Sequence, residues 1–172
     1  LLNLMSSLRE IRSTCLELAL HRFYSAPENA VQFISILTKD RSSVSRRLID
    51  WLATNYSKSQ QVNYEVGSEN FNMFASYKSH LKGYSKRYFD PFQRKDRIQF
   101  ELLGKEYTTT VGQLNFFKWA IQYKVIDYAK DNYNRINQNM IKTKENVTIG
   151  QRKLLSMHKG FTHTKANIVM EF

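Results

Sequence analysis

Apolar residues recur every three to five positions over the first third of the chain, which is the spacing of amphipathic helices. The pattern predicts three helices in an N-terminal helical segment over residues 1–56, with Ser25 and Pro27 at the start of the second helix. Cys15 lies on the apolar stripe of the first helix, a position that favours a small core residue over a nucleophile. This stripe comprises Leu4, Leu8, Ile11, Cys15, Leu18 and Phe23.

Residues 57–69 are polar and aperiodic, with Gly67 near their end, and they predict a connecting loop. A core of helices and a hairpin follows over residues 70–141, beginning with a helix that carries aromatic side chains three or four positions apart. A row of aromatic rings can stack on bases. The helical spacing favours a buried face instead, since burying each ring stabilises the fold substantially. The stripe comprises Phe71, Phe74, Tyr77, Leu81 and Tyr84.

Two runs of alternating apolar and polar residues, 98–103 and 107–111, predict a β-hairpin. Gly104 and Lys105 form a tight turn between them. Thr110 is followed three residues later by Gln113, which is the pattern of a capping box at the start of a helix. The hairpin is therefore expected to lead directly into a well-capped, aromatic-rich helix.

Helical spacing continues to about residue 141, with a kink or restart near Lys124. Residues 142–172 then form a basic tail, in which six Lys or Arg and only Glu145 occur between positions 142 and 165. This composition favours a segment that is flexible or ordered by a partner. Residues 166–172 alternate and predict a final strand beside the hairpin. The expected fold class is α+β, mostly helical with a small antiparallel β-hairpin or sheet.

The formal net charge is +11 and the isoelectric point is near 9.8, which favours acidic or phosphate-rich partners. Between residues 78 and 97, seven basic side chains stand against Asp90 and Asp96, with aromatic residues interleaved around an Asp90–Pro91 turn. This stretch is either an electropositive binding surface or a solvated face whose aromatic residues anchor the turn. The candidate partner-binding or nucleic-acid-binding residues are Lys78, Lys82, Lys86, Arg87, Arg94, Lys95 and Arg97.

The sequence contains few of the patterns that carry chemistry. One cysteine rules out an internal disulfide framework, and no apolar run approaches the roughly 18 residues of a membrane span. The four histidines lack metal-ligand spacing, and acidic residues are scattered. Walker A, dinucleotide-binding, GxSxG and HExxH motifs are all absent. The sequence therefore predicts a protein that is not an enzyme and needs no cofactor or metal.

Four blocks of sequence resemble a virion-associated protein family of nucleocytoplasmic large DNA viruses, such as phycodnaviruses, iridoviruses and relatives of mimivirus. They are IDWLATNYSK, FNMFASYKSHLKGYSKRYFDPFQRKDRIQF, TTVGQLNFFKWAIQYKVIDY and the closing LLSMHKGFTHTKANIVMEF. The resemblance covers most of the chain after about residue 40. The family often carries a cysteine and an arginine pair after the DPF turn, where this chain has Gln93, Arg94 and Lys95, so a thiol role there does not carry over.

The resemblance implies a minor capsid protein, located in the virion and, during assembly, in the host cytoplasm or viral factory. The leading hypothesis is a structural virion protein that docks other capsid or virion proteins through its basic surface. The alternative is a DNA- or RNA-binding protein for genome packaging or late transcription. The positive charge supports both hypotheses and does not decide between them. The chain starts with Leu1 rather than methionine, which is compatible with a segment of a longer protein.

Overall fold

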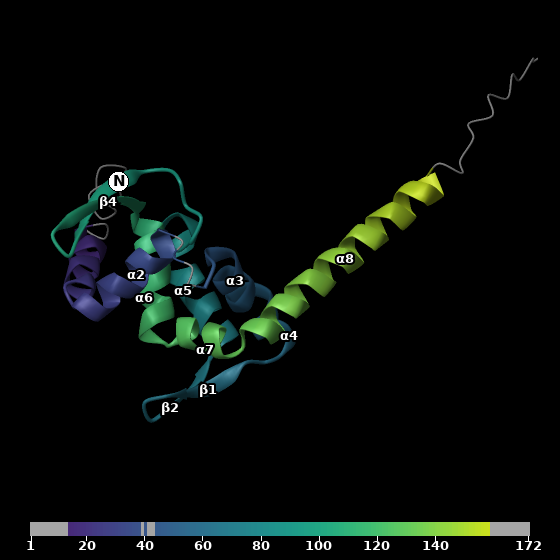
Figure 1. Ribbon diagram of the computed structural model, residues 1–172, viewed down its shortest axis with the longest axis horizontal. Coiled ribbons are helices and arrows are strands. Elements are labelled where there is room, and N and C mark those ends of the chain that lie inside the picture. The colour runs from purple at the N-terminus through teal and green to yellow at the C-terminus, as the bar shows by residue number, and fades with distance from the viewer. Residues whose placement is uncertain (1–13, 39, 41–43, 159–172) are drawn as a thin grey trace, which may run out of the picture.

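The computed structural model describes residues 14–38, 40 and 44–158 of the 172-residue chain (Figure 1). It confirms the expected α+β class: helices predominate, and the described residues contain two separate two-stranded antiparallel sheets. After a helical stretch over residues 14–24, the elements are α2 (Pro27–Leu37), α3 (Arg46–Trp51), the π-helical turn η1 (Leu52–Tyr56), α4 (Ser57–Ser59), β1 (Asn63–Val66), β2 (Glu69–Asn72), α5 (Met73–Tyr88), β3 (Arg97–Leu102), β4 (Lys105–Thr110), α6 (Val111–Gln122), α7 (Val125–Asp131) and α8 (Tyr133–His158).

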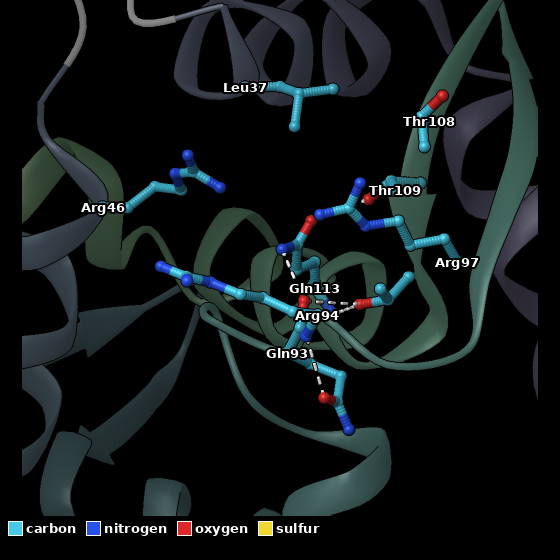
Figure 2. A pocket seen from close by; sticks show the side chains of 9 residues that line it. Leu37, Arg46, Gln93, Arg94, Arg97, Thr108, Thr109 and Gln113 are labelled. Atoms are coloured by element: carbon cyan, nitrogen blue, oxygen red, sulfur yellow. Dashed lines mark hydrogen bonds between the residues drawn. The ribbon is translucent and has the colours of Figure 1, made fainter.

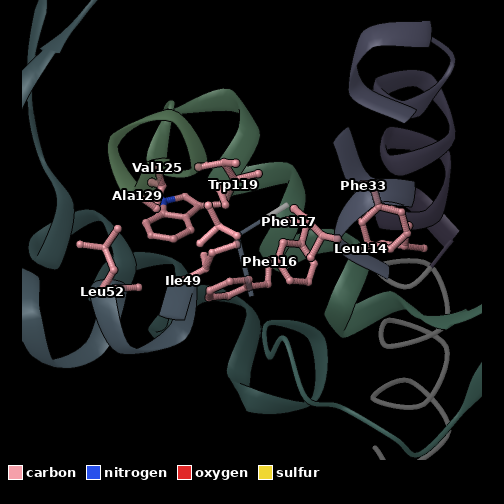
Figure 3. Close-up of a cluster of buried hydrophobic side chains, with 14 of the residues drawn as sticks. Phe33, Ile49, Leu52, Leu114, Phe116, Phe117, Trp119, Val125 and Ala129 are labelled. Carbon is pink, nitrogen blue, oxygen red and sulfur yellow. The ribbon is translucent and has the colours of Figure 1, made fainter. Parts of the chain in front are cut away.

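Helix α6 is the centre of the hydrophobic core, and nine of its 12 residues are buried. Its aromatic side chains meet those of α2 and α5 around it, and the Phe33 and Phe117 rings lie 5.8 Å apart (Figure 3). The Trp119 indole N–H donates to Ser76 Oγ at 3.0 Å. As predicted, the helix opens at Thr110, whose hydroxyl accepts a hydrogen bond from the Gln113 N–H.

Over residues 14–24, the predicted buried stripe of the first helix is wrong at Cys15 and Leu18, whereas Phe23 packs partly buried against the core. Cys15 is exposed and Leu18 is 65% exposed, whereas Leu20 and Tyr24 are buried. The reason is the contact with α6, since the Tyr24 hydroxyl donates to Leu114 O at 2.8 Å and turns this face inward. The apolar residues predicted at positions 4, 8 and 11 lie outside the described residues. The side chain of Ser25 also does not cap α2, because it donates to a carbonyl in the preceding helix.

Residues 57–69, predicted as a connecting loop, contain the end of a helix and one strand of a hairpin. Strands β1 and β2 pair across a turn that includes Gly67 at φ +65°. Two aromatic side chains attach the hairpin to the core: Tyr64 stacks on Tyr128 and donates to Tyr123 O at 2.7 Å, and the buried Phe71 stacks on Tyr123. Because most of its other side chains are exposed and polar, the local sequence carries little strand signal.

Helix α5 begins at Asn72, whose side chain accepts a hydrogen bond from the Ala75 N–H. The predicted aromatic stripe is only partly correct, because Phe71 is buried but lies in β2 rather than in the helix. Tyr77 and Leu81 pack partly buried against the core, but Tyr84 is 37% exposed. The backbone leaves the helical conformation at Ser85, where φ is +64°, and the chain then turns into the basic segment. Tyr84 keeps ring contacts with His80 and Phe89, and the break just after it leaves this end of the stripe more exposed.

The predicted hairpin is present as β3 and β4, which pair from Arg97 opposite Thr110 to Leu102 opposite Lys105. Its two-residue turn consists of Leu103 and Gly104, one position earlier than expected, and both have positive φ. Phe100 and Leu102 of β3 are buried, which attaches the hairpin to the core.

Helix α8 runs through the predicted boundary of the basic tail at residue 142. A restart occurs at Lys124 as expected (φ +55°), but the helix that begins at Tyr133 continues to His158. It is anchored at its start, where Trp51 donates to Asn139 Oδ1 at 3.2 Å, and then extends away from the rest of the described chain (Figure 1). Ile136 and Met140 near its start are buried, whereas most side chains from Ile141 to Thr148 are exposed. The strand predicted over 166–172 lies outside the described residues.

Candidate functional site

Three arginine side chains from separate elements line one cavity of about 290 Å³ (Figure 2). Arg46 is the first residue of α3, Arg94 lies in the turn between α5 and β3, and Arg97 is the first residue of β3. In Figure 2, Arg46 and Arg97 enter from opposite sides and Arg94 lies below them. We call this cavity the arginine pocket. Its lining residues are Leu37, Arg46, Gln93, Arg94, Arg97, Thr108, Thr109, Thr110 and Gln113.

Buried polar side chains form the base of the arginine pocket. The Gln113 side-chain amide donates to Gln93 O at 2.8 Å and its oxygen accepts from Thr109 Oγ1 at 3.0 Å. Gln113 is only 9% exposed and Thr109 only 2% exposed. We call the turn between α5 and β3 the basic turn. The Gln113 side chain thus binds Gln93 of this turn, whereas in a full capping box it would bind the Thr110 N–H. A buried amide with both ends bonded holds the neighbouring Arg94 backbone in a defined place.

The turn that carries Arg94 lies tightly against the start of α6. The Asp90 N–H donates to Gly112 O at 3.2 Å, and the Asn115 side chain donates to Tyr88 O at 2.9 Å. A Cβ atom on Gly112 would lie 2.8 Å from Arg87 O, closer than such atoms normally approach. Glycine at this position therefore permits the close contact on which the turn depends.

The electrostatic surroundings leave the pocket positive. Among the described residues, neither of the two ion pairs involves Arg46, Arg94 or Arg97. The lining described above contains no carboxylate. Burial raises the pKa of the Asp50 carboxyl, and the negative charge of Asp90 raises it further, while Lys86 opposes this. Arginine keeps its charge at all relevant pH values, so the pocket is a permanent cationic site.

The chain matches a known protein family over residues 8–166, the family of unknown function DUF7197. It belongs to this family. It is also similar to the uncharacterized protein L507 of Acanthamoeba polyphaga mimivirus, with 33% identity over 71% of this chain and 51% of that protein. The chain therefore spans about half the length of this relative. No solved structure matches. The DUF7197 match and the mimivirus relative support the resemblance to a protein family of giant viruses.

The structure divides the basic residues predicted in this DUF7197 chain into three groups. Arg94 and Arg97 enter the arginine pocket. Arg87 and Lys95 line a second hollow of about 110 Å³, where Arg87 pairs with Asp96 at 3.0 Å. The remaining three lie exposed in α5: Lys78, Lys82 and Lys86.

Arg46 is the pocket residue that sequence reasoning missed. It is half-buried, unlike the exposed Arg94 and Arg97. It stands far from the basic stretch in sequence, and its neighbours carry only the signal of an amphipathic helix capped by Ser45. No local pattern separates it from Arg47, which is exposed and does not line the pocket.

The described residues show no group of three or more His, Cys, Asp and Glu side chains placed to hold a metal ion. Within the same residues, no helix is both long and apolar enough to cross a membrane. Among the described residues, the arginine pocket is the feature with the clearest chemical character, and that character is cationic.

Proposed function

We propose that this chain is a non-enzymatic docking protein of a large double-stranded DNA virus. In this role it is a structural component of the virion, a minor capsid protein that binds acidic groups on other virion proteins. The observation that carries the proposal is the arginine pocket, in which Arg46, Arg94 and Arg97 share one cavity without a carboxylate in its lining. Guanidinium groups bind carboxylates and phosphates through paired hydrogen bonds, so such a pocket is suited to capture an anionic group.

The composition of the pocket supports binding rather than catalysis. Its lining combines arginine, threonine, glutamine and leucine, and includes neither histidine, cysteine nor a carboxylate. Threonine needs a neighbouring base to act as a nucleophile, and proton transfer needs a group that titrates near neutral pH. The hydroxyl of Thr109 is already committed as a donor to Gln113.

Membership of DUF7197 and the mimivirus relative support an origin in a large DNA virus, and the place in the virion is part of the proposal. The test is to locate the chain in purified particles of the virus that carries the gene. A docking protein of the shell is expected at a fixed copy number, and should stay with the shell after the particles are opened and treated with nuclease. Absence from purified particles would overturn the proposal. The same chain would be found in the cytoplasmic viral factory during assembly.

The second candidate is a nucleic-acid-binding protein for packaging or late transcription, which the net charge of +11 favours. Such a protein would leave the particle together with the genome on nuclease treatment. Its affinity for duplex DNA would also fall linearly with the logarithm of the salt concentration, with a slope set by the number of phosphate contacts. Either result would favour this candidate over the docking protein.

A further inference from the structure

The three positive charges of the arginine pocket exceed the single negative charge of a carboxylate. Each guanidinium carries one charge and five N–H donors in a planar fork. A carboxylate presents two oxygens and one negative charge, whereas a phosphate monoester presents three oxygens and a charge of about −1.5 to −2 at neutral pH. Arg46 and Arg97 enter the cavity from opposite sides and the Arg94 side chain runs toward the Arg46 side, so the pocket offers three positive charges to a larger, tetrahedral anion (Figure 2).

The form of the cavity favours a terminal phosphate over one inside a polymer. The pocket is a recess of about 290 Å³ whose base is closed by the buried side chains of Thr109 and Gln113. A terminal phosphate can enter a recess with its single ester bond pointing outward. A backbone phosphodiester continues on both sides and needs an open groove, as proteins that follow nucleic-acid strands provide.

The surroundings also disfavour a nucleic acid. No aromatic residue belongs to the described lining, so bases have no ring to stack on beside the phosphate.

We propose that the arginine pocket binds the phosphate group of a phosphorylated serine or threonine on a partner protein. This inference rests on the proposed function, because it names the chemical group that the docking surface recognises. Phosphorylation of the partner then controls docking, since unmodified serine offers the three guanidinium groups no charge.

The test measures the binding of the full chain to short fluorescein-labelled peptides by fluorescence anisotropy. Three peptides with alanine and glycine flanks differ only at the central residue, which is phosphoserine, glutamate or serine. The phosphoserine peptide is expected to bind at least about tenfold more tightly than the glutamate peptide, because the dianion meets all three arginines. The serine peptide should show no measurable binding. Inorganic phosphate should compete with the phosphoserine peptide.

The variant Arg46→Gln is expected to weaken binding of the phosphoserine peptide about tenfold, which corresponds to about 1.4 kcal/mol. Arg47→Gln is the matched control, since it removes the same charge from the next residue on α3, which does not line the pocket. It should change the affinity less than about twofold. Arg46→Lys keeps the charge and loses the fork, so its affinity should fall between those of the wild type and Arg46→Gln. Unchanged circular dichroism and melting temperature establish that the variants fold.

The outcomes separate this inference from the proposed function. Equal affinity for the phosphoserine and glutamate peptides, both sensitive to Arg46→Gln, would overturn the phosphate inference and leave acidic docking intact. Equal losses for Arg46→Gln and Arg47→Gln would overturn the assignment to the pocket. Tighter binding of single-stranded DNA that depends on Arg46 would overturn it in favour of the nucleic-acid candidate. If no anionic peptide bound at all, the inference and the docking function would both fail.

Discussion

Two basic regions of the molecule carry three positive charges each but differ in how those charges are held. The arginine pocket gathers Arg46, Arg94 and Arg97 from α3, the basic turn and β3 into one cavity. The lysine face of α5 spaces its three charges four residues apart, at exposed positions. We define this lysine face as Lys78, Lys82 and Lys86. The two regions therefore carry the same number of charges, but only the three arginines share one cavity.

The two regions differ in the contacts that support their charged residues. Under the arginine pocket, a buried glutamine and the tight contact at Gly112 hold the backbone of the turn against α6. The lysine face has water on its outer side, and each flexible ammonium group there is screened by salt. The contacts of Gln113 and Gly112 fix the backbone of the turn that carries Arg94, whereas the lysine face is the exposed side of a single helix.

The largest expected effect comes from neutralising each region in turn. The triple variant R46Q/R94Q/R97Q should weaken binding of an anionic peptide about 100-fold, or about 2.7 kcal/mol, because three convergent contacts are lost. The triple variant K78Q/K82Q/K86Q removes the same charge and should weaken it less than about threefold at physiological salt. Calorimetric titration of both variants measures the difference. Equal losses would mean that the protein acts only through its total charge.

Adding a methyl group at Gly112 tests whether the arginine pocket depends on the close contact between the basic turn and α6. Gly112→Ala should lower the free energy of unfolding by about 1–3 kcal/mol, because the new Cβ meets Arg87 O and Gln93 Cβ. Gly83→Ala is the control, since nothing lies within 4 Å of the Cβ position there and alanine favours a helix by about 1 kcal/mol. Urea denaturation measures both. Loss of anion binding should accompany Gly112→Ala alone, and retention of full affinity would separate the pocket from the turn.

The hydrogen bonds below the pocket should contribute a smaller amount. Gln113→Ala removes the partner of the Thr109 hydroxyl and leaves Gln93 O only the longer hydrogen bond from Thr110 Oγ1 at 3.5 Å, so it should reduce the free energy of unfolding by about 1 kcal/mol or more. Gln122→Ala removes the same side chain from an exposed position at the end of α6. It should stay within about 0.5 kcal/mol of the wild type. If thermal unfolding shows equal effects, the buried amide does not support the turn.

The smallest effect concerns the carboxyl group of Asp50, one helical turn after Arg46, and it depends on pH. The pKa of Asp50 is raised above its ordinary value of 3.8 by burial and by Asp90, so folding favours the neutral carboxyl. Its contribution to stability is therefore greatest below that ordinary value and declines as the pH rises through the raised pKa. Asp50→Asn should increase the melting temperature at pH 7 and leave it nearly unchanged near pH 3. Asp131→Asn, at an exposed position, is the control. A stabilising effect of equal size at both pH values would contradict the explanation.

Much of the fold could be predicted because its signals are local. The alternation in β3 and β4, the Thr110 cap and the restart at Lys124 all arise from contacts within a few residues. The β1–β2 hairpin escaped prediction because it is held by contacts such as those of Tyr64, whose partners Tyr123 and Tyr128 lie about 60 residues away. The length of α8 escaped because its composition resembles that of a solvated tail as much as that of a helix.

The candidate site could be predicted only in part, and for the same reason. The basic stretch contains Arg94 and Arg97, but their neighbours Arg87 and Lys95 line a different hollow that also contains Asp96. Charge along the sequence does not reveal which way each side chain turns. The conformation of the turn decides this, and it depends on contacts with the start of α6.

By itself, the sequence determined the class of fold, the capped central helix, the second hairpin and the basic character of the surface. These follow from periodicity, capping and composition, which act over short distances or over the whole chain. Only the tertiary structure decided that Arg46 joins Arg94 and Arg97, and that Gln113 binds the turn rather than its own helix end. A pocket requires residues distant in sequence to meet in space, and that meeting depends on how the core packs α3, α6 and β3 together.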